Sequence, residues 1–368
     1  MLTKYKAKHI VMLELILLLI FSSALIKQGL DKEASMYTSM QDSEKAFIKW
    51  VSFDVSKKAM DRAYNYDIDT KDKEVHLNWI ELLAYLGAKY GGDFSRYKEK
   101  HMEDIAEKLT SKEETIESLT DGMKYYDYYY EAYSAVLGGM VGEYQIEVAD
   151  ESSPTGKRWE EKYGLKAFLP IAKFYPYSHY DDFGVSRSYG YKRRHLGHDM
   201  MGQVGTPIIA VESGYVEALG WNQYGGWRIG IRSFDKKRYY YYAHLRQNFP
   251  YNKSLEEGSV VQAGDVIGYL GRTGYSSKEN ANNIRTPHLH FGMQLIFDES
   301  QKESVNEIWI DCYDLVLFLY KNRCETVKDP ETKEYHRVYQ FLDPAAEEYI
   351  KHQIYKYDDE EIDIHIYD

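Results

Sequence analysis

The stretch "TPHLHFG" at residues 286–292 places two histidines one residue apart in an apolar setting. In a β-strand, the side chains of residues i and i+2 point to the same face. His288 and His290 would therefore stand side by side, with Leu289 and Phe291 on the opposite face. Two interpretations are open at this point. The pair is either two packed core histidines, each needing its own hydrogen-bond partner, or a metal site where one imidazole binds and the other serves catalysis.

The sequence on the N-terminal side of this stretch predicts an antiparallel sheet. Short apolar and aromatic runs alternate with glycines and turn residues, a spacing that is typical of such sheets. The runs are "TPIIAV" (206–211), "GYVEALGW" (214–221), "GWRIGIRSF" (226–234), "RYYYYAHL" (238–245) and "SVVQAGDVIGYLG" (259–271).

A second cluster of polar residues lies in "RRHLGHDMMG" (193–202). In an extended segment His195 and Asp199 share a face, while His198 falls on the other. Two imidazoles and a carboxylate form a common catalytic zinc set, with the fourth position left for water. Such a zinc ion lowers the pKa of the water and polarises a carbonyl. A general base is still required, and histidine suits that role near neutral pH.

Five motifs together resemble the lysostaphin/LytM-type peptidoglycan metalloendopeptidases, peptidase family M23. They occur in the family's order, and the resemblance covers roughly residues 165–300. The motifs are "HLGHD", "GTPIIAVESGYV", "YYAHL", "VVQAGDVIGYLGRTG" and "TPHLHFG".

The resemblance implies a Zn2+ ion bound by His195, Asp199 and His290, and two catalytic histidines, His244 and His288. It also implies the activity: a zinc-dependent endopeptidase that hydrolyses peptide cross-links of bacterial peptidoglycan, in which a metal-activated water attacks the scissile carbonyl. The alternative is a catalytically inactive M23-like protein that binds the wall or activates a hydrolase. Inactive relatives lose ligands, whereas all five expected residues are present here.

Other features near these motifs fit structural roles. "VVQAGDVIGYLGRTG" also resembles the hairpins of lipoyl and biotinyl carriers, but it lacks the lysine that such carriers modify. Asp181 and Asp182 in "YDDFG" either line the cleft or cap a turn, and the turn is favoured. Arg187 in "SRSYG" either contacts a carboxylate of a stem peptide or is a surface arginine, and the surface arginine is favoured.

The N-terminus predicts export. Lys4, Lys6 and Lys8 precede the run "IVMLELILLLIFSSALI" (10–26), which is apolar except for Glu14. A basic flank before an apolar span places the chain beyond that span outside the cytoplasm. We therefore expect a single-pass bacterial membrane protein with an extracytoplasmic catalytic domain, or a secreted one if "SSA" (22–24) is cleaved. The net charge of −12 argues against a nucleic-acid partner.

Residues 43–140 are predicted to be helical. "SEKAFIKWV" (43–51) opens with residues in capping order, and "KEVHLNWIELLAYLGAKYGG" (73–92) ends in a glycine pair that predicts a helix stop. A further helix is expected over "CYDLVLFLYKNRC" (312–324). Twelve helical residues span about 18 Å, too far for a disulfide between the two cysteines.

The expected fold class is a multidomain α+β protein, with an N-terminal anchor and a helical domain before an antiparallel β-sheet M23 peptidase domain. Its expected segments are a cytoplasmic stub and transmembrane anchor (1–30), a stalk (31–42), a helical domain (43–148), a linker (149–164), the M23 metallopeptidase domain (165–300), and a C-terminal helix with a charged tail (301–368).

Overall fold

A computed structural model describes residues 47–188, 192–302 and 306–363 of the chain. The chain divides into two compact units. The first comprises Met1–Val51 with Phe297–Ile308, and the second comprises Ser52–Ile296 with Trp309–Asp368. Within the described part of the first unit, the Gln301 side-chain amide donates a 2.8 Å hydrogen bond to the carbonyl of Ile48. The 3-10 helix η2 (Glu299–Gln301) also belongs to this unit, and all the expected site residues lie in the second.

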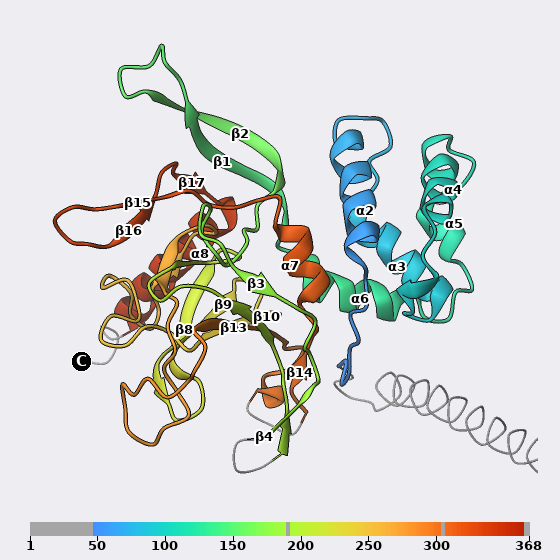
Figure 1. Cartoon of the computed structure of the whole chain (residues 1–368). Coiled ribbons are helices and arrows are strands. Elements are labelled where there is room, and N and C mark those ends of the chain that lie inside the picture. The colour runs from blue at the N-terminus through green and yellow to red at the C-terminus, as the bar shows by residue number, and fades with distance from the viewer. Residues whose placement is uncertain (1–46, 189–191, 303–305, 364–368) are drawn as a thin grey trace, which may run out of the picture. The chain divides into compact units, whose positions relative to one another are not determined.

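Five α-helices occupy the N-terminal part of the second unit (Figure 1). Asn78 caps α3 by accepting a 2.9 Å hydrogen bond from the amide of Ile80. The same helix ends at Gly91, whose φ of 64° is readily adopted by glycine. The helices are α2 (Lys57–Thr70), α3 (Trp79–Tyr90), α4 (Glu99–Thr110), α5 (Ile116–Thr120) and α6 (Tyr126–Leu137), with the 3-10 helix η1 (Phe94–Arg96) between α3 and α4.

The prediction of a helix that begins at residue 43 is wrong over the residues that the structure describes, 47–56. Residues 47–56 contain no helix, and α2 begins only at Lys57, after a Ser56 cap. Val51, Phe53 and Val55 are buried while the residues between them are not. Buried and less buried residues alternate with a period of two, as in an extended chain. This pattern outweighs the capping signal as a guide to the structure of the segment.

The main sheet of the second unit is antiparallel, and the runs predicted at 214–221, 226–234 and 238–245 form three of its strands, whereas the run at 206–211 lies outside it. Its path runs β11-β8-β9-β10-β13-β6-β3, with every neighbouring pair antiparallel. These strands are β3 (Ser178–His179), β6 (His198–Met201), β8 (Gly214–Asn222), β9 (Gly226–Ser233), β10 (Arg238–Ala243), β11 (Val260–Val261) and β13 (His288–Leu295). Two smaller pairs are β4 (Ser186–Ser188) with β5 (Lys192–Arg194), and β7 (Pro207–Ile209) with β12 (Val266–Tyr269).

The linker predicted over 149–164 is wrong, because this segment holds most of a β-hairpin. Strands β1 (Val141–Ala149) and β2 (Lys157–Leu165) pair along their whole length and form a long hairpin in Figure 1, and β17 (Phe341–Leu342) pairs with β1. The Ser, Pro and Gly residues that suggested a linker form the hairpin turn. In that turn the Asp150 amide donates a 2.9 Å hydrogen bond to the carbonyl of Gly156.

The C-terminal segment contains more strand than the expected helix and charged tail. Its elements are β14 (Ile308–Trp309), α7 (Tyr313–Leu319), β15 (Thr326–Lys328), β16 (Tyr335–Arg337), β17 and α8 (Pro344–Asp363). Helix α7 stops well before Cys324, since the Asn322 side chain donates 3.1 and 2.8 Å hydrogen bonds to the carbonyls of Leu165 and Ala167. Cys312 and Cys324 are both buried free thiols, as predicted, although no long helix separates them.

A buried ion-pair network joins the helices to the sheet. Arg238 of β10 is 1% exposed and donates a 2.7 Å hydrogen bond from Nε to Glu212, and another of 2.7 Å from Nη1 to the carbonyl of Ala135 in α6. The carbonyls at the end of a helix lack partners within the helix, so this guanidinium satisfies one of them. The helical segment and the sheet thus belong to one compact unit, without a division at the predicted linker.

The predicted cytoplasmic stub and membrane anchor (1–30) and the predicted stalk (31–42) lie outside the described residues. Among the residues that the structure describes, no helix combines the length and apolar character needed to cross a membrane.

Candidate metal centre

The paired histidines of "TPHLHFG" lie at the start of β13, on one face of the strand. Leu289 and Phe291 point to the opposite face and are fully buried, as the alternation predicts. Antiparallel pairing sets His290 directly opposite Asp199 of β6 and opposite Ala243 of β10. The register of three neighbouring strands therefore gathers these residues at one place on the sheet.

The structure brings the three predicted ligands together. The Nε2 atom of His195 lies 3.0 Å from Oδ1 of Asp199 and 3.0 Å from Nδ1 of His290, and that Nδ1 lies 3.1 Å from the same Oδ1. Their side chains are 8%, 12% and 16% exposed for His195, Asp199 and His290, so the cluster is shielded but accessible. Within the described residues, these three side chains form the group of histidine, cysteine and carboxylate side chains whose ligand atoms lie close enough together to share a metal ion.

The donor set fits zinc. Imidazole nitrogens and carboxylate oxygens bind Zn2+ at about 2.0–2.2 Å, usually in tetrahedral geometry. Tetrahedral ligand atoms at those bond lengths are about 3.3–3.6 Å apart, a few tenths of an ångström more than the three distances in this triangle. Three protein ligands also leave a fourth position open, as catalytic zinc sites require.

His244 and His288 stand next to the triangle with one ring nitrogen fixed. Nδ1–H of His244 donates a 2.9 Å hydrogen bond to the carbonyl of Thr273, and Nδ1–H of His288 donates one of 2.8 Å to the carbonyl of Thr286. Their ring centroids are 4.8 Å apart. Nε2 of His288 lies 3.6 Å from Oδ1 of Asp199. In each ring the fixed tautomer leaves the lone pair on Nε2, which is therefore available for proton transfer.

The electrostatics of the cluster favour positive charge inside the triangle. Burial lowers the pKa of His195, but hydrogen bonds and charges from Asp182 and Asp199 outweigh it and raise the pKa to about 9. Because Nδ1–H already faces Asp182, the additional proton resides on Nε2, where a cation would bind. Burial lowers the pKa of His244 far below its ordinary value, and nearby histidines add to the effect, so this ring is neutral.

His198 lies on the other face of β6, as its position in the sequence predicts. It is 1% exposed, and its Nε2 lies 2.7 Å from Nδ1 of His179. Burial lowers the pKa of His198 to about 4, which keeps the ring neutral. It is a packed histidine and not a member of the triangle.

Two residues given structural roles from the sequence instead reach the site. Asp182 is 3% exposed, and its Oδ2 lies 3.2 Å from Nδ1 of His195. Arg187 contacts both Asp182 and Asp199 through one guanidinium nitrogen. No local pattern revealed these contacts, because they depend on the pairing of β4 with β5 and on the position of β6.

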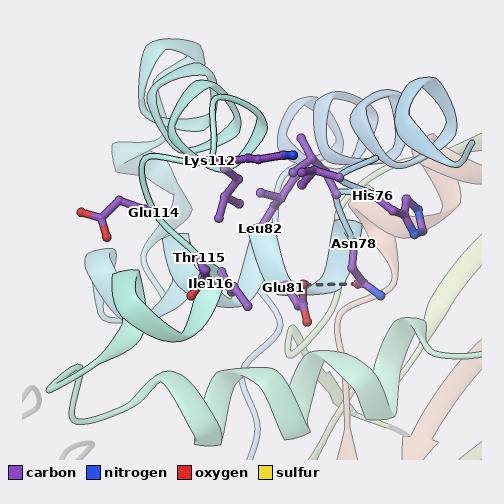
Figure 2. Close-up of a pocket in the computed structure, with 11 residues that line it drawn as sticks. His76, Asn78, Glu81, Leu82, Lys112, Glu114, Thr115 and Ile116 are labelled. Carbon is purple, nitrogen blue, oxygen red and sulfur yellow. Dashed lines mark hydrogen bonds between the residues drawn. The ribbon is translucent and has the colours of Figure 1, made fainter. Parts of the chain in front are cut away.

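A cavity of about 320 Å³ lies in the helical part of the second unit. In Figure 2 its labelled side chains come from the segment leading into α3 and the first turn of that helix, and from the α4–α5 connection with the first residue of α5. Figure 2 also draws the 3.3 Å hydrogen bond from the Glu81 amide to the Asn78 side chain, which ties the first turn of α3. None of the five expected site residues lines this cavity, so it is separate from the candidate metal centre.

Comparison with known proteins assigns the family of this region. Residues 193–306 match Peptidase family M23. The L-Ala--D-Glu endopeptidase of Bacillus subtilis (strain 168) is 40% identical over 131 residues, which cover 35% of this chain and 38% of that protein. Lysostaphin of Staphylococcus staphylolyticus is 39% identical over 98 residues, covering 26% of this chain and 18% of that protein.

Among solved structures, a lytM protein from Ruminococcus gnavus ATCC 29149 aligns with a TM-score of 0.49 at 24% identity, covering 77% of this chain and 94% of that one. The chain matches 38% or less of the length of both curated relatives, so the similarity concerns their shared region. The chain carries a peptidase domain of family M23, with its antiparallel sheet.

Proposed function

We propose that the M23 domain of this chain is a zinc-dependent endopeptidase that hydrolyses peptide cross-links of bacterial peptidoglycan. The observation that carries the proposal is the triangle of His195, Asp199 and His290, with the free Nε2 atoms of two further histidines beside it. The match of residues 193–306 to a peptidase family supports hydrolysis. The resemblance to lysostaphin/LytM-type enzymes supports a wall peptide as the substrate.

In this proposal His195, Asp199 and His290 hold the metal. A bound zinc ion supplies a Lewis acid for the scissile carbonyl and lowers the pKa of a coordinated water toward about 7. His244 and His288 handle protons at their Nε2 atoms: one accepts the proton of the attacking water, and the other, once protonated at Nε2, donates a hydrogen bond to the developing oxyanion. The water oxygen bonds to the carbonyl carbon, the C–N bond breaks, and the proton passes to the leaving amine.

The fixed tautomers support these roles. Each ring is held by a backbone carbonyl through Nδ1, so neither has to reorient before its Nε2 meets the substrate. The neutral state of His244 supports its assignment as the proton acceptor. Positioned acid–base groups of this type contribute about 100- to 10,000-fold to the rate.

The test is digestion of purified cell walls that differ in cross-link chemistry, with the released peptides and new amino termini identified by mass spectrometry. We expect one type of peptide bond to be cut, with cleavage lost on chelation and restored by Zn2+. The His288→Ala protein should keep its zinc and lose cleavage, since it changes one catalytic histidine outside the triangle. Full zinc occupancy without new amino termini on any wall would contradict the proposal and favour an inactive, wall-binding protein.

We also propose that the catalytic domain works outside the cytoplasm, held by the apolar run 10–26. Three lysines before that run support this orientation. Protease added to intact protoplasts should degrade residues 165–300 while a cytoplasmic marker survives. Protection of both would contradict the orientation.

A further inference from the structure

Asp182 is a buried carboxylate directed at a ring of the candidate metal centre. It is 3% exposed, and both its Oδ2 and its backbone carbonyl lie within hydrogen-bond distance of Nδ1 of His195, at 3.2 and 3.1 Å. The opposite nitrogen of the same ring, Nε2, belongs to the triangle. Asp182 therefore contacts the side of the ring that faces away from the metal position.

Arg187 makes the corresponding contact for the carboxylate ligand. Asp199 directs Oδ1 into the triangle, and its other oxygen, Oδ2, accepts a 3.1 Å hydrogen bond from Nη2 of Arg187. The same nitrogen donates to Oδ2 of Asp182. One guanidinium nitrogen thus joins two carboxylates that would otherwise repel each other.

The contacts of Asp182 and Arg187 leave one polar atom of each side chain buried without a hydrogen-bond partner among the described residues. Oδ1 of Asp182 and Nε of Arg187 are buried without a hydrogen-bond partner in the described structure. Buried polar atoms of native proteins are rarely left unpaired, and exceptions tend to occur where a function retains them. A surface turn would not require a carboxylate at this depth.

We propose that Asp182 and Arg187 are positioning residues of the metal centre, a conclusion that rests on the proposed function. Asp182 fixes the tautomer and direction of His195, so that the Nε2 lone pair faces the metal. Arg187 holds Asp199 with one oxygen toward the metal and neutralises part of the charge of the two carboxylates. Partners of this kind orient the ligands and raise their basicity, and their loss typically costs about 10- to 100-fold in metal affinity.

The test measures zinc affinity of the full-length chain by competition with a chromogenic chelator. Asp182→Asn keeps the shape of the side chain and removes its charge, and we expect zinc to bind about 10- to 100-fold more weakly. Arg187→Gln should have a similar effect, while Arg187→Lys keeps a cationic nitrogen and should restore part of the affinity. Asp181→Asn is the matched control, because this exposed neighbour carries the same substitution; its zinc affinity should stay within about twofold of the unmutated chain.

Two further measurements separate positioning from folding. The visible absorption of the Co2+-loaded protein reports ligand geometry, and it should change in Asp182→Asn but not in Asp181→Asn. The melting temperature of the metal-free variants reports folding. A lowered melting temperature with unchanged zinc affinity and an unchanged Co2+ spectrum would overturn the inference. Equal zinc affinities across the variants would overturn the inference alone. An unmutated protein that binds no zinc would instead overturn the proposed function itself.

Discussion

Gly197 lies between the ligands of the candidate metal centre, and its missing side chain creates room for His290. A Cβ atom added there would come 2.5 Å from both Cε1 and Nε2 of the His290 ring, and 2.9 Å from the carbonyl oxygen of Phe291. Ordinary van der Waals contact begins at 3.4 Å, so the ring or the loop must move by about 0.9 Å. We predict that Gly197→Ala displaces His290 from the triangle and weakens zinc binding.

The magnitude follows from the overlap. Forcing a methyl group into a packed site costs about 1–3 kcal/mol. If His290 relieves the strain by leaving the triangle, the whole cost falls on the metal-bound state, and zinc affinity drops about 5- to 150-fold. In the metal-free protein the same movement relieves the overlap with the His290 ring and leaves only the 2.9 Å contact with the Phe291 carbonyl, so its melting temperature should fall less than its zinc affinity implies.

The assay compares zinc affinity by chelator competition with the thermal melting of the metal-free protein. Gly164→Ala is the control, since the nearest atom to an added Cβ there is 3.5 Å away, an ordinary contact. Zinc affinity of Gly197→Ala within about twofold of the control would refute the reasoning, because it would show that the loop accommodates the methyl group without moving the ligand.

Three further predictions concern the site and the fold. His290→Ala should lose zinc and turnover together. His288→Ala and His244→Ala should keep near-stoichiometric zinc by elemental analysis and lose about 100- to 10,000-fold in turnover. Zinc lost from His288→Ala but kept in His290→Ala would reverse these roles. Arg238→Ala should lower the free energy of unfolding by about 3–5 kcal/mol in urea titrations, because it leaves the buried Glu212 charge unpaired. A loss below about 1 kcal/mol, the range of surface ion pairs, would contradict this prediction. Burial raises the pKa of the Asp311 carboxyl from its ordinary 3.8 to about 6, so ionisation opposes folding above that pH; Asp311→Asn should therefore stabilise the protein at pH 7 and not at pH 3, and an equal gain at both would argue against a charge effect.

Local periodicity was sufficient to predict much of the sheet and the faces of the site residues. Strands β8, β9 and β10 occupy the runs predicted for them, because alternating side chains between glycines suit a half-buried strand and little else. The same alternation placed His288 and His290 on one face and His198 on the other. The stop of α3 at Gly91 was also predictable, since glycine at a left-handed position ends a helix by local geometry.

Segments with ambiguous local signals were predicted less well. The turn of the β1–β2 hairpin has the composition of a linker, and only the pairing of the two strands distinguishes them. Helix α7 was predicted too long, because contacts of Asn322 with residues far away in the sequence hold the chain in another direction.

The sequence by itself determined which residue types could bind a metal and on which face of a strand each would lie. Only the tertiary structure decided which of them meet: the register of β6, β10 and β13 brings Asp199, His290 and the end of β10 together. It also decided that Asp182 and Arg187 reach the site, since both contacts depend on the pairing of β4 with β5 beside the ligands. The physical reason is that face and turn preferences act between near neighbours along the chain, whereas a metal centre depends on distances between segments that only the packed fold sets.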